Sequence, residues 1–481
     1  MEELQRSSQT EDVPVELIQR IQSLLPVKEA AHTCVLSKNW SHAWSTIPNL
    51  RFNVTSKFPN EEKERDYINF MDRTISKYAQ HNIPIESFKL NLDNKLASHL
   101  ANKWIPTVAA QSCLKELSIC ICYSYDSKII LPDEIFSGKN LHTLSLRDSR
   151  FSPIETVSRN PVIKCVNLRV LKLEFVKISE EVLDTLFSTC ILLEKIHLSV
   201  DFGLKTFKVR NLHYLQELKL MISRPFDVLK IDDVPDLRLF FYYVVREPIK
   251  TFNLASLTSV TELSLHGVII DFAFLDMIVS KLPSLEILCL LIRNWTLERL
   301  NFTSSSLKRL TLTIRVRKKI VIQVNAPKLH HLSYSGNTMP SLLFRSSEAH
   351  DYMKLKLHLW DPIDRSFFLK MREILNLPSK FDIEIRCISY EPAKIDNEDR
   401  EISDKPIYSG EIRSSEKYFC DLFKPMISGL MENRIYDLKD IEFKNPAGNE
   451  KWEILTADYY TSTILDISDD LFYSVELKLN W

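Results

Sequence analysis

The stretch DVPVELIQRIQSLLPVKEAAHTCVLSKNWSHAWSTIPNLRF, from Asp12 to Phe52, decides the fold of the amino-terminal part of the chain. Its apolar residues recur at helical spacing, and prolines separate three short helices. Pro14 suits the first turn of the first helix, Pro26 ends that helix, and Ser37 can cap the third. One apolar stripe on the first helix contains Leu17, Ile18, Ile21, Leu24 and Leu25. In the third helix Trp40 and Trp44 lie one turn apart on the same face.

These three helices carry more apolar side chain than they can bury among themselves. Fully burying one large apolar side chain contributes roughly 1.5–3 kcal/mol, and a segment of about 40 residues is near the lower limit for independent folding. We therefore expect the segment to pack against a partner. The alternative is that the helices only cap the domain that follows them.

The same stretch resembles the F-box of plant F-box proteins. The matching residues are Val13-Pro14 in place of the usual Leu-Pro, Leu17-Ile18, the run from Leu24 to Lys28, Ala30, the run from Val35 to Lys38, Trp40 and Trp44. The resemblance implies that this segment docks on the Skp adaptor of a cullin–RING ubiquitin ligase. The residues it implicates in that contact are Pro14, Leu17, Ile18, Ile21, Leu24, Leu25, Pro26, Val35, Leu36, Trp40 and Trp44.

Composition narrows the class of protein. A chain of 481 residues exceeds one compact core and predicts two or three domains or a repeat array. The net charge of -1 gives no general attraction to nucleic acid or acidic membranes. The polar start MEELQRSSQTEDV is no secretory leader, nine cysteines fit reduced thiols, and the longest apolar run, Ile287 to Ile292, is too short to span a membrane. We expect a soluble protein of the cytoplasm or nucleus.

The middle of the chain repeats the pattern L-x-x-L-x-L. Its first positions are Leu114, Leu141, Leu168, Leu193, Leu215, Leu237, Val260, Leu285, Leu307 and Leu329, with a weaker early copy at Ile85 and a degenerate one at Leu237-Phe240-Tyr242. Steps of 22 to 27 residues between these positions are typical of leucine-rich repeats. Each copy supplies one short strand, and stacking the copies makes a parallel sheet with a continuous core behind it.

Segments between the strands differ in length. Glu180 to Cys190 and Phe272 to Leu282 predict helices, and the shorter connections are expected to be irregular. The phrases Leu131-Pro132 with Ile135-Phe136, and Leu282-Pro283-Ser284-Leu285-Glu286, extend the resemblance to plant F-box/leucine-rich-repeat proteins, as does Trp104. The carboxy-terminal region, with Leu438 to Phe443 and the final VELKLNW, resembles the FBD region of that family.

The predicted fold is α/β: a three-helix F-box, a curved leucine-rich-repeat solenoid with a parallel concave sheet, and an α+β carboxy-terminal cap. The expected divisions are a disordered tail (1–11), the F-box (12–52), a helical connector (53–84), the solenoid (85–340) and an FBD-like cap (341–481). In the connector, Tyr67, Phe70, Met71, Ile75 and Tyr78 are expected on one face. Beyond Tyr352 the sequence predicts a strand in KLKLHLW, a helix around 367–375, a strand at 381–388 and a mobile loop near 391–417.

Motifs for catalysis or metal binding are missing from the sequence. Cys113, Cys120 and Cys122 lack the paired spacing of zinc sites, and His330 and His331 face opposite sides of a strand, so we expect no metal and no cofactor. No nucleophile elbow, zinc-protease or phosphate-loop motif occurs, which favours a non-catalytic protein. The run RVRKK, 315–319, fits exposed loop charges better than a nuclear-import or nucleic-acid signal.

Alternating residues of the repeats predict a target-binding surface. On the concave face Arg147, Lys172, His197 and Lys219 form a basic strip that Glu174 interrupts, followed by the apolar cluster Met221, Phe241 and Tyr243. Our hypothesis is that an acidic or phosphorylated segment of a target lies on the strip, with an apolar anchor near Tyr243. In the alternative, Phe241 and Tyr243 fill a distorted core.

These expectations converge on a substrate-receptor subunit of a Skp–cullin–F-box ubiquitin ligase. Such a subunit raises the local concentration of a target lysine, and other subunits supply the chemistry. The alternative is a leucine-rich-repeat scaffold or inhibitor that works without a ligase. The sequence identifies neither the target nor a small-molecule co-ligand.

Overall fold

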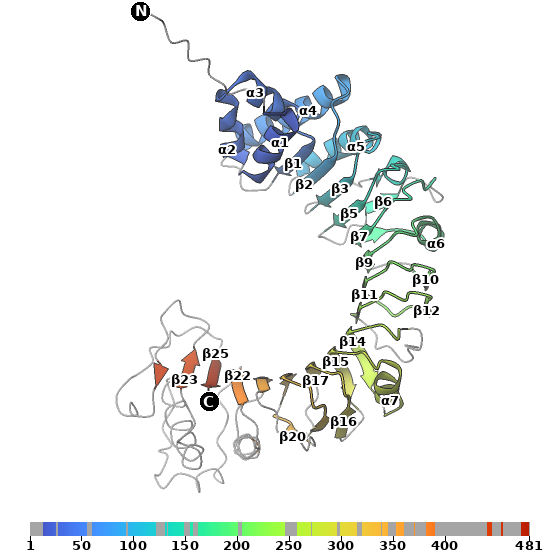
Figure 1. Ribbon diagram of the computed structural model, residues 1–481, viewed down its shortest axis with the longest axis vertical. Helices are drawn as coiled ribbons and strands as arrows, with labels where there is room; N and C mark the ends of the chain where they lie inside the picture. Colours follow the sequence, from blue (N-terminus) through green and yellow to red (C-terminus); the bar gives the residue numbers. More distant parts are fainter. Residues whose placement is uncertain are drawn as a thin grey trace, which may run out of the picture. The chain divides into compact units, whose positions relative to one another are not determined.

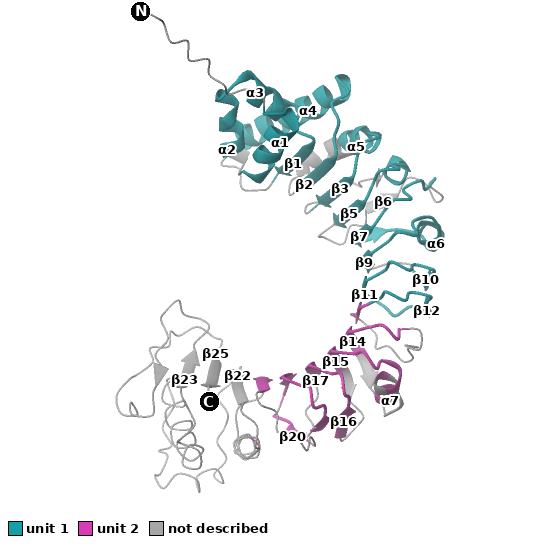
Figure 2. Cartoon of the chain, viewed as in Figure 1, with its two compact units in different colours: residues 1–237 teal, residues 238–481 magenta. Residues whose placement is uncertain are grey.

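The structure is a computed structural model in which the chain divides into two compact units, residues 1–237 and 238–481 (Figure 2). The residues it describes are 13–25, 27–54, 60–92, 95–121, 130–131, 133–148, 154–156, 162–200, 204–245, 257–270, 272–295, 299–314, 320–337, 339–344, 353–359, 370, 381–389, 440–444, 454–455 and 473–480. In both units N-terminal or connecting helices accompany a parallel sheet of stacked coils, so the predicted α/β solenoid class is confirmed (Figure 1).

Three helical segments open the first unit, as the sequence predicts. They are α1 (Val15–Leu24), α2 (Val27–His32) with a 3₁₀ turn (Thr33–Val35), and α3 (Lys38–Ser45). The hydroxyl of Ser37 accepts the Trp40 amide at 3.3 Å and caps α3. Pro14 lies one residue before α1, where its carbonyl accepts the amides of Leu17 and Ile18.

The sheet begins earlier than the repeat pattern predicts. Strand β1 (Asn49–Val54) follows α3 directly and pairs in parallel with β2 (Ser87–Leu92). Leu50, Phe52 and Val54 alternate into the core. The sequence interpretation missed this strand because it carries no L-x-x-L-x-L pattern.

Helix α4 (Glu61–Gln80) packs beside β1 with a face that differs from the expected one. Ile68, Met71, Ile75 and Tyr78 are buried, whereas Phe70 is exposed. Positions spaced three or four residues apart define a single stripe, and Phe70 lies off that stripe. Of the five residues predicted to share one face, Met71, Ile75 and Tyr78 are buried and Tyr67 is half-buried, so the prediction was wrong for Phe70.

Seven strands of the first unit form one parallel ladder in chain order. They are β1, β2, β3 (Glu116–Ile121), β5 (Thr143–Asp148), β7 (Val170–Glu174), β9 (Lys195–Val200) and β11 (Glu217–Ile222). The repeat leucines of these strands point into the core, for example Leu144, Leu171 and Leu218, none of which is accessible to solvent. We call the opposite side of each unit's sheet its open face.

The back of the first unit is built from helices and short strands. These elements are α5 (Lys95–Ala109), β4 (Ile130–Leu131), a 3₁₀ turn (Asp133–Phe136), β6 (Ile154–Thr156), β8 (Val176–Lys177), α6 (Glu180–Thr189), β10 (Thr206–Arg210) and β12 (Val228–Asp232). Figure 1 shows α6, β10 and β12 on the same side of the ladder. The connections β10 and β12, expected to be irregular, pair with each other in parallel.

The second unit continues the same design. Its open-face strands are β13 (Leu239–Val244), β14 (Glu262–Ile270), β15 (Ile287–Trp295), β17 (Arg309–Ile314), β19 (His331–Gly336), β21 (Met353–Leu359) and β22 (Phe381–Ser389), all parallel. Behind them lie α7 (Phe272–Lys281) and the parallel strands β16 (Arg299–Thr303), β18 (Val321–Asn325) and β20 (Ser341–Phe344). The degenerate repeat is a regular strand, because Phe240 and Tyr242 take the buried positions of leucines.

The ladder of the second unit extends past the point where the repeat pattern fades. The expected strands near 353 and 381 are present as β21 and β22, and both are parallel members of the ladder. Antiparallel strands follow: β25 (Tyr473–Asn480) pairs with β22, and β23 (Asp440–Lys444) pairs with β25 and β24 (Ile454–Leu455). The change of direction at β22 ends the parallel stack.

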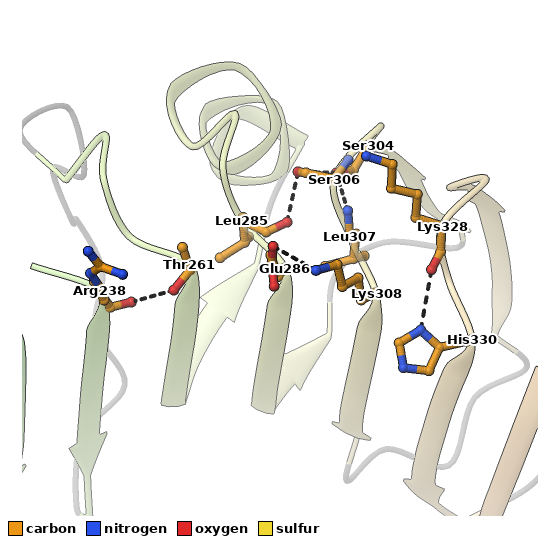
Figure 3. A network of polar contacts seen from close by, with 10 residues as sticks. All are labelled: Arg238, Thr261, Leu285, Glu286, Ser304, Ser306, Leu307, Lys308, Lys328 and His330. Atoms are coloured by element: carbon orange, nitrogen blue, oxygen red, sulfur yellow. Dashed lines mark hydrogen bonds and ion pairs between the residues drawn. The ribbon is translucent and has the colours of Figure 1, made fainter.

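A recurring turn precedes each repeat strand. In most repeats the amide of the first repeat leucine donates to the carbonyl three residues earlier, for example Leu168 to Cys165 at 3.1 Å and Leu285 to Leu282 at 3.2 Å, whereas the Leu307 amide donates to the Ser304 hydroxyl. In the second unit side chains reinforce the turns, since Ser306 donates to the Leu285 carbonyl at 2.8 Å and Lys308 pairs with Glu286 at 2.8 Å (Figure 3). These turns set the register of each strand with the one before it.

Several expectations fall outside the described residues. They concern the tail 1–11, Pro26, Cys122, the RVRKK run 315–319, most of the helix around 367–375, and the loop 391–417. In the described part of the chain no helix combines the length and apolar character needed to cross a membrane.

Candidate functional site

The interior of the three-helix segment is small, and this decides what its surface presents. Its buried apolar residues are Ile18, Ala30 and Ala43, two of them alanines. Gln22 is also buried, and its amide donates to the Thr33 hydroxyl at 2.9 Å and to the Trp40 carbonyl at 3.1 Å. Among the described side chains of the segment, the buried ones are therefore one isoleucine, two alanines and one amide, and the larger apolar side chains lie elsewhere.

Those larger side chains are on the surface. Leu24 is 75% exposed, Val35 87%, Leu36 63% and Leu17 55%, and Val13 and Ile21 are exposed as well. We call these six residues the apolar patch. Of the residues expected at the adaptor contact, Ile18 instead lies beneath the patch, and Leu25, Trp40 and Trp44 are half-buried. Pro14 is exposed at the start of α1. Transferring apolar surface of this extent out of water would stabilise a complex.

Polar contacts fix the three helices to the sheet. Gln19 of α1 donates to the Thr46 carbonyl at 2.9 Å, just after α3 ends. The hydroxyl of Tyr78 in α4 donates to the Ile47 carbonyl at 3.0 Å, and burial raises the pKa of this phenol to about 12. The Pro48 carbonyl then accepts the Glu86 amide at 2.8 Å. The segment from Thr46 to Pro48 is therefore held from both sides.

The basic strip lies on the open face of the first unit, and acidic side chains interleave it. Arg147 pairs with Glu174 at 3.0 Å, as the sequence order suggests. His197 contacts Glu217 at 2.9 Å, and Lys219 and Lys195 also pair with Glu217. Lys172 lies between these two groups in register with Ser145 and His197. The strip is thus a chain of ion pairs.

Glu217 is the residue that sequence reasoning missed. Burial opposes its ionisation, but hydrogen bonds with Lys219 and His197 prevail and hold its pKa at about 2. Burial lowers the pKa of His197, Glu217 acts in the opposite direction, and Lys219 and Lys172 add to the lowering. The sequence does indicate the position of Glu217, because alternation along β11 places Glu217, Lys219 and Met221 on the same side of the strand.

The open face of the first unit remains net positive. Among its described side chains the basic ones outnumber the acidic ones: Arg51, Lys89, Arg147, Lys172, Lys195 and Lys219 against Glu116, Glu174 and Glu217. Met221, the last expected residue in this unit, is exposed. The whole chain carries a net charge of -1, so the excess of basic side chains distinguishes this face from the chain as a whole.

The open face of the second unit begins with an aromatic cluster. Phe241 and Tyr243 are half-buried there, while the core is filled by Phe240 and Tyr242, so the first pair does not fill a distorted interior. Both rings contact His266, with centroids at 5.0 and 5.5 Å. Ser264 and Cys289 lie at 3.2 and 3.7 Å from the His266 Nε2.

This cluster carries no sign of an active centre. Burial lowers the pKa of His266 and raises that of Cys289, so the thiol stays protonated and is a poor nucleophile.

Cys165 and Cys190 in the first unit are buried, with their sulfur atoms 3.6 Å apart. Within the described ranges no group of three His, Cys, Asp or Glu side chains could hold a metal ion.

Comparison with known proteins finds the same repeats elsewhere. The family model for the leucine-rich repeats of the FBD-associated F-box protein At5g56370 matches residues 101–250 and 245–348. An Arabidopsis thaliana protein described as putative F-box/LRR-repeat protein At5g41840 is 28% identical over 198 residues, covering 39% of this chain and 36% of that protein. Another, putative F-box/LRR-repeat protein At3g49150, is 34% identical over 152 residues, covering 30% and 23%.

A third relative carries the FBD name. The putative FBD-associated F-box protein At5g56410 of Arabidopsis thaliana is 28% identical over 233 residues, covering 44% of each chain. The matched region thus spans less than half the length of each of these three relatives.

Proposed function

This chain belongs to the plant F-box/LRR proteins with FBD-associated members, and from that we propose that it is the substrate receptor of a Skp–cullin–F-box ubiquitin ligase. In this proposal the three-helix segment binds a Skp-family adaptor, and through it the cullin–RING ligase. The open faces of the repeats bind a target protein. The chain itself performs no chemistry and needs no cofactor: it acts by holding a target lysine near the ubiquitin-conjugating enzyme.

The apolar patch is the observation that carries the proposal. Six large apolar residues are exposed within a short segment whose described buried side chains are Ile18, Ala30, Ala43 and Gln22. Leu24 is 75% exposed and Val35 is 87% exposed. Several exposed apolar side chains on one short segment are typical of a docking face.

The target would meet two kinds of surface. On the first unit the net positive face, with Lys172, Lys219 and Arg147, favours an acidic segment. On the second unit Phe241 and Tyr243 offer aromatic surface of the kind that anchors interfaces. These assignments extend the prediction of a target surface at Arg147, Lys172, His197, Lys219, Met221, Phe241 and Tyr243.

Co-expression with a Skp adaptor tests the adaptor contact. We expect the full chain to co-purify with the adaptor and Leu24→Asp or Val35→Asp to lose it. A charge placed in a desolvated apolar contact costs several kcal/mol, so affinity should fall by about a hundredfold or more. Both side chains are exposed in the free protein, so the variants should keep their fold.

A matched control is available in the repeats of the same unit. Val166 is exposed to a similar degree as Ile21 but lies on the turn before β7, outside the apolar patch. Val166→Asp should therefore bind the adaptor like the unaltered chain. A well-folded chain that fails to bind any Skp adaptor would contradict the proposal and favour a scaffold that works without a ligase.

A further inference from the structure

Two successive coils of the first unit each place a buried cysteine at the same position of the turn before a repeat strand. Cys165 and Cys190 each lie three residues before the first leucine of a repeat, and their carbonyl oxygens accept the amides of these leucines at 3.1 and 3.2 Å. The other described turns of this kind hold Gln111, Gly138, Leu212, Val234, Leu257, Leu282 and Ala326 at this position. Among these described turns, two thiols in adjacent coils occur only here.

The register of the sheet brings the two cysteines within the range of a disulfide. Strands β7 and β9 pair in parallel with Val170 opposite Lys195, and each cysteine lies five residues before its member of this pair. Neighbouring strands are about 4.8 Å apart, and the Cα atoms of a disulfide are about 4.4–6.8 Å apart. The two sulfur atoms lie 3.6 Å from each other. Each would move by less than about 1 Å to reach the disulfide bond length of about 2.05 Å.

The contact between the two thiols makes them chemically unequal. The Cys190 thiol donates to the Cys165 carbonyl at 3.3 Å and lies against the Cys165 sulfur. A hydrogen bond from Cys190 lowers the pKa of Cys165, and the same contact together with burial raises the pKa of Cys190. Cys165 is therefore the better nucleophile of the two, and Cys190 is the thiol that keeps its proton.

The pair lies directly beneath the turns and not deep in the core. Both cysteines are 0% exposed, but the residues that follow them, Val166 and Ile191, are 47% and 55% exposed. Turns open locally at a lower free energy than the core of a domain. A small uncharged oxidant can reach the sulfur atoms through such an opening, whereas a bulky oxidant such as glutathione disulfide needs a much larger one.

Apolar packing alone does not require cysteine at either position. Val234 and Ala326 occupy the same position in other coils and are buried there without any thiol. Cysteine can take this packing role, but it also brings a side chain that can be oxidised. In Cys165 and Cys190 that side chain meets a second thiol close to bonding distance, which is the further requirement for a disulfide.

We propose that Cys165 and Cys190 form an oxidative modification site, at which hydrogen peroxide converts the two thiols into a disulfide between successive coils. The proposal does not depend on the proposed function, because it concerns the stack of coils and not the apolar patch. Without peroxide both cysteines are free thiols, as they are in the structure.

The reaction consumes one peroxide for each pair of thiols. The Cys165 sulfur attacks one peroxide oxygen, the O–O bond breaks, and the departing hydroxide takes the Cys165 proton to form water, which leaves Cys165 as a sulfenic acid. The Cys190 sulfur then attacks the Cys165 sulfur, the S–O bond breaks, and the departing hydroxide takes the Cys190 proton as a second water. Two electrons pass from the two sulfur atoms to the peroxide, which is reduced to water.

The disulfide joins residues 25 positions apart in the sequence, so the closed loop contains β8 and α6. The bond lies at the end of α6, where the Cys190 amide donates to the Leu186 carbonyl at 2.8 Å. A cross-link of this kind restricts the unfolded chain and thereby stabilises the folded one. Oxidation would therefore stabilise the coil that carries α6 behind the ladder (Figure 1).

Thiol mapping of the full chain tests the proposal. The chain is treated with hydrogen peroxide, unfolded in iodoacetamide to block the remaining free thiols, and digested with trypsin without a reductant. Trypsin cleaves between the cysteines at Arg169, Lys172 and Lys177, so the disulfide appears in mass spectra as two joined peptides. We expect this joined species, two hydrogens lighter than the sum of its peptides, and its loss on treatment with dithiothreitol.

Cys113 and Cys120 of the same unit are internal controls, because both are half-buried and thus more exposed than the pair. The Cys113 thiol donates to the Ile85 carbonyl at 3.4 Å, and Cys120 lies on the open face of β3. Oxidation governed by exposure alone would modify these two first. Unmodified Cys165 and Cys190 under conditions that oxidise Cys113 and Cys120 would overturn the proposal. A disulfide that joins two chains, seen as a dimer in non-reducing electrophoresis, would also overturn it.

Thermal unfolding measures the effect of the cross-link on stability. The oxidised chain should unfold about 5–10 °C above the same chain after dithiothreitol, which is the usual effect of a disulfide on a unit of this size. Cys190→Ala should lose both the joined peptides and this shift, and Ala326 shows that the turn accepts alanine at this position. Cys165→Ala should behave in the same way. A shift that persists in both variants, or a cross-linked chain without any shift, would contradict the proposal.

Discussion

Glu217 shows how one side chain alters the character of a surface. The sequence pattern suggests a basic strip along Lys172, His197 and Lys219, but Glu217 contacts Lys219 and the His197 imidazole of this strip, and Lys195 beside it. The carboxylate ties β9 to β11 across the open face. The predicted surface comprised two of the three outward positions of each strand, and Glu217 occupies the remaining one in β11.

The low pKa of Glu217 makes stability depend on pH. Its folded-state pKa is about 2 against an ordinary value of 4.5, so its contribution is complete above pH 4.5 and disappears as the pH falls toward 2. We expect Glu217→Gln to lower the free energy of unfolding by about 2 kcal/mol at neutral pH and by much less near pH 2. Urea unfolding at both pH values checks this; an equal loss at both would contradict the assignment.

Gly267 is a second residue that matters at this scale, because its position leaves no room for a side chain. It has φ +85° at a bulge in β14, and an added Cβ would lie 2.6 Å from the Val244 carbonyl oxygen. We expect Gly267→Ala to destabilise the second unit by about 1–3 kcal/mol through backbone strain and this close approach. Thermal unfolding measures the loss. Gly138→Ala, with negative φ and no contact closer than 3.5 Å, should be nearly neutral.

At the scale of elements, the connections behind the sheet differ from repeat to repeat. The intervals from Leu168 to Leu193 and from Val260 to Leu285 contain the helices α6 and α7. Among the described residues, the shorter intervals that start at Leu193, Leu285 and Leu307 contain the back strands β10, β16 and β18. Length alone does not decide between helix and strand, because the longer repeats that start at Leu114 and Leu141 contain the back strands β4 and β6.

Much of this level could be predicted from the sequence. The leucine pattern identifies the open-face strands, and helical periodicity identifies α1, α3, α6 and α7, because their apolar residues follow one period. The short back strands, β1 and the face of α4 could not be predicted, since five-residue strands carry little periodicity and their pairing depends on neighbouring coils.

The aromatic repeat provides a direct test at this scale. Phe240 is inaccessible to solvent in the core, and its neighbour Phe241 lies on the open face against His266. We expect Phe240→Ala to cost about 3–5 kcal/mol of unfolding free energy and Phe241→Ala to cost much less. Chemical denaturation of the two variants compares them. Similar losses would show that β13 does not follow the alternation described.

For the whole molecule, the junction between α3 and β1 matters most. In the first unit no flexible linker separates the three helices from the sheet: Gln19 holds Thr46, Tyr78 holds Ile47, and the Pro48 carbonyl accepts the Glu86 amide. The helical segment and the first coils therefore move as one body. A substrate receptor with this junction would hold a target, bound on the first coils, in a fixed orientation relative to the helical segment that contacts the ligase.

That rigidity can be measured. We expect a Gly-Ser-Gly-Ser insertion between Thr46 and Ile47 to broaden the distance distribution between spin labels on α1 and β5, because it separates Thr46, which Gln19 holds, from Ile47, which Tyr78 holds. The apolar patch is untouched, so adaptor capture should persist. Equally sharp distributions before and after insertion would contradict a rigid junction.

Strand β1 directly follows the helical segment and is also the first strand of the ladder. The distance from the helical segment to any coil of the first unit is therefore a whole number of strand spacings. Each coil of the first unit adds one strand spacing of about 4.8 Å. Inserting or deleting one coil would move a target bound further along the first unit by that distance. The contacts of the apolar patch would stay the same. The number of coils in the first unit therefore sets the distance between the helical segment and a target bound on the open face of that unit.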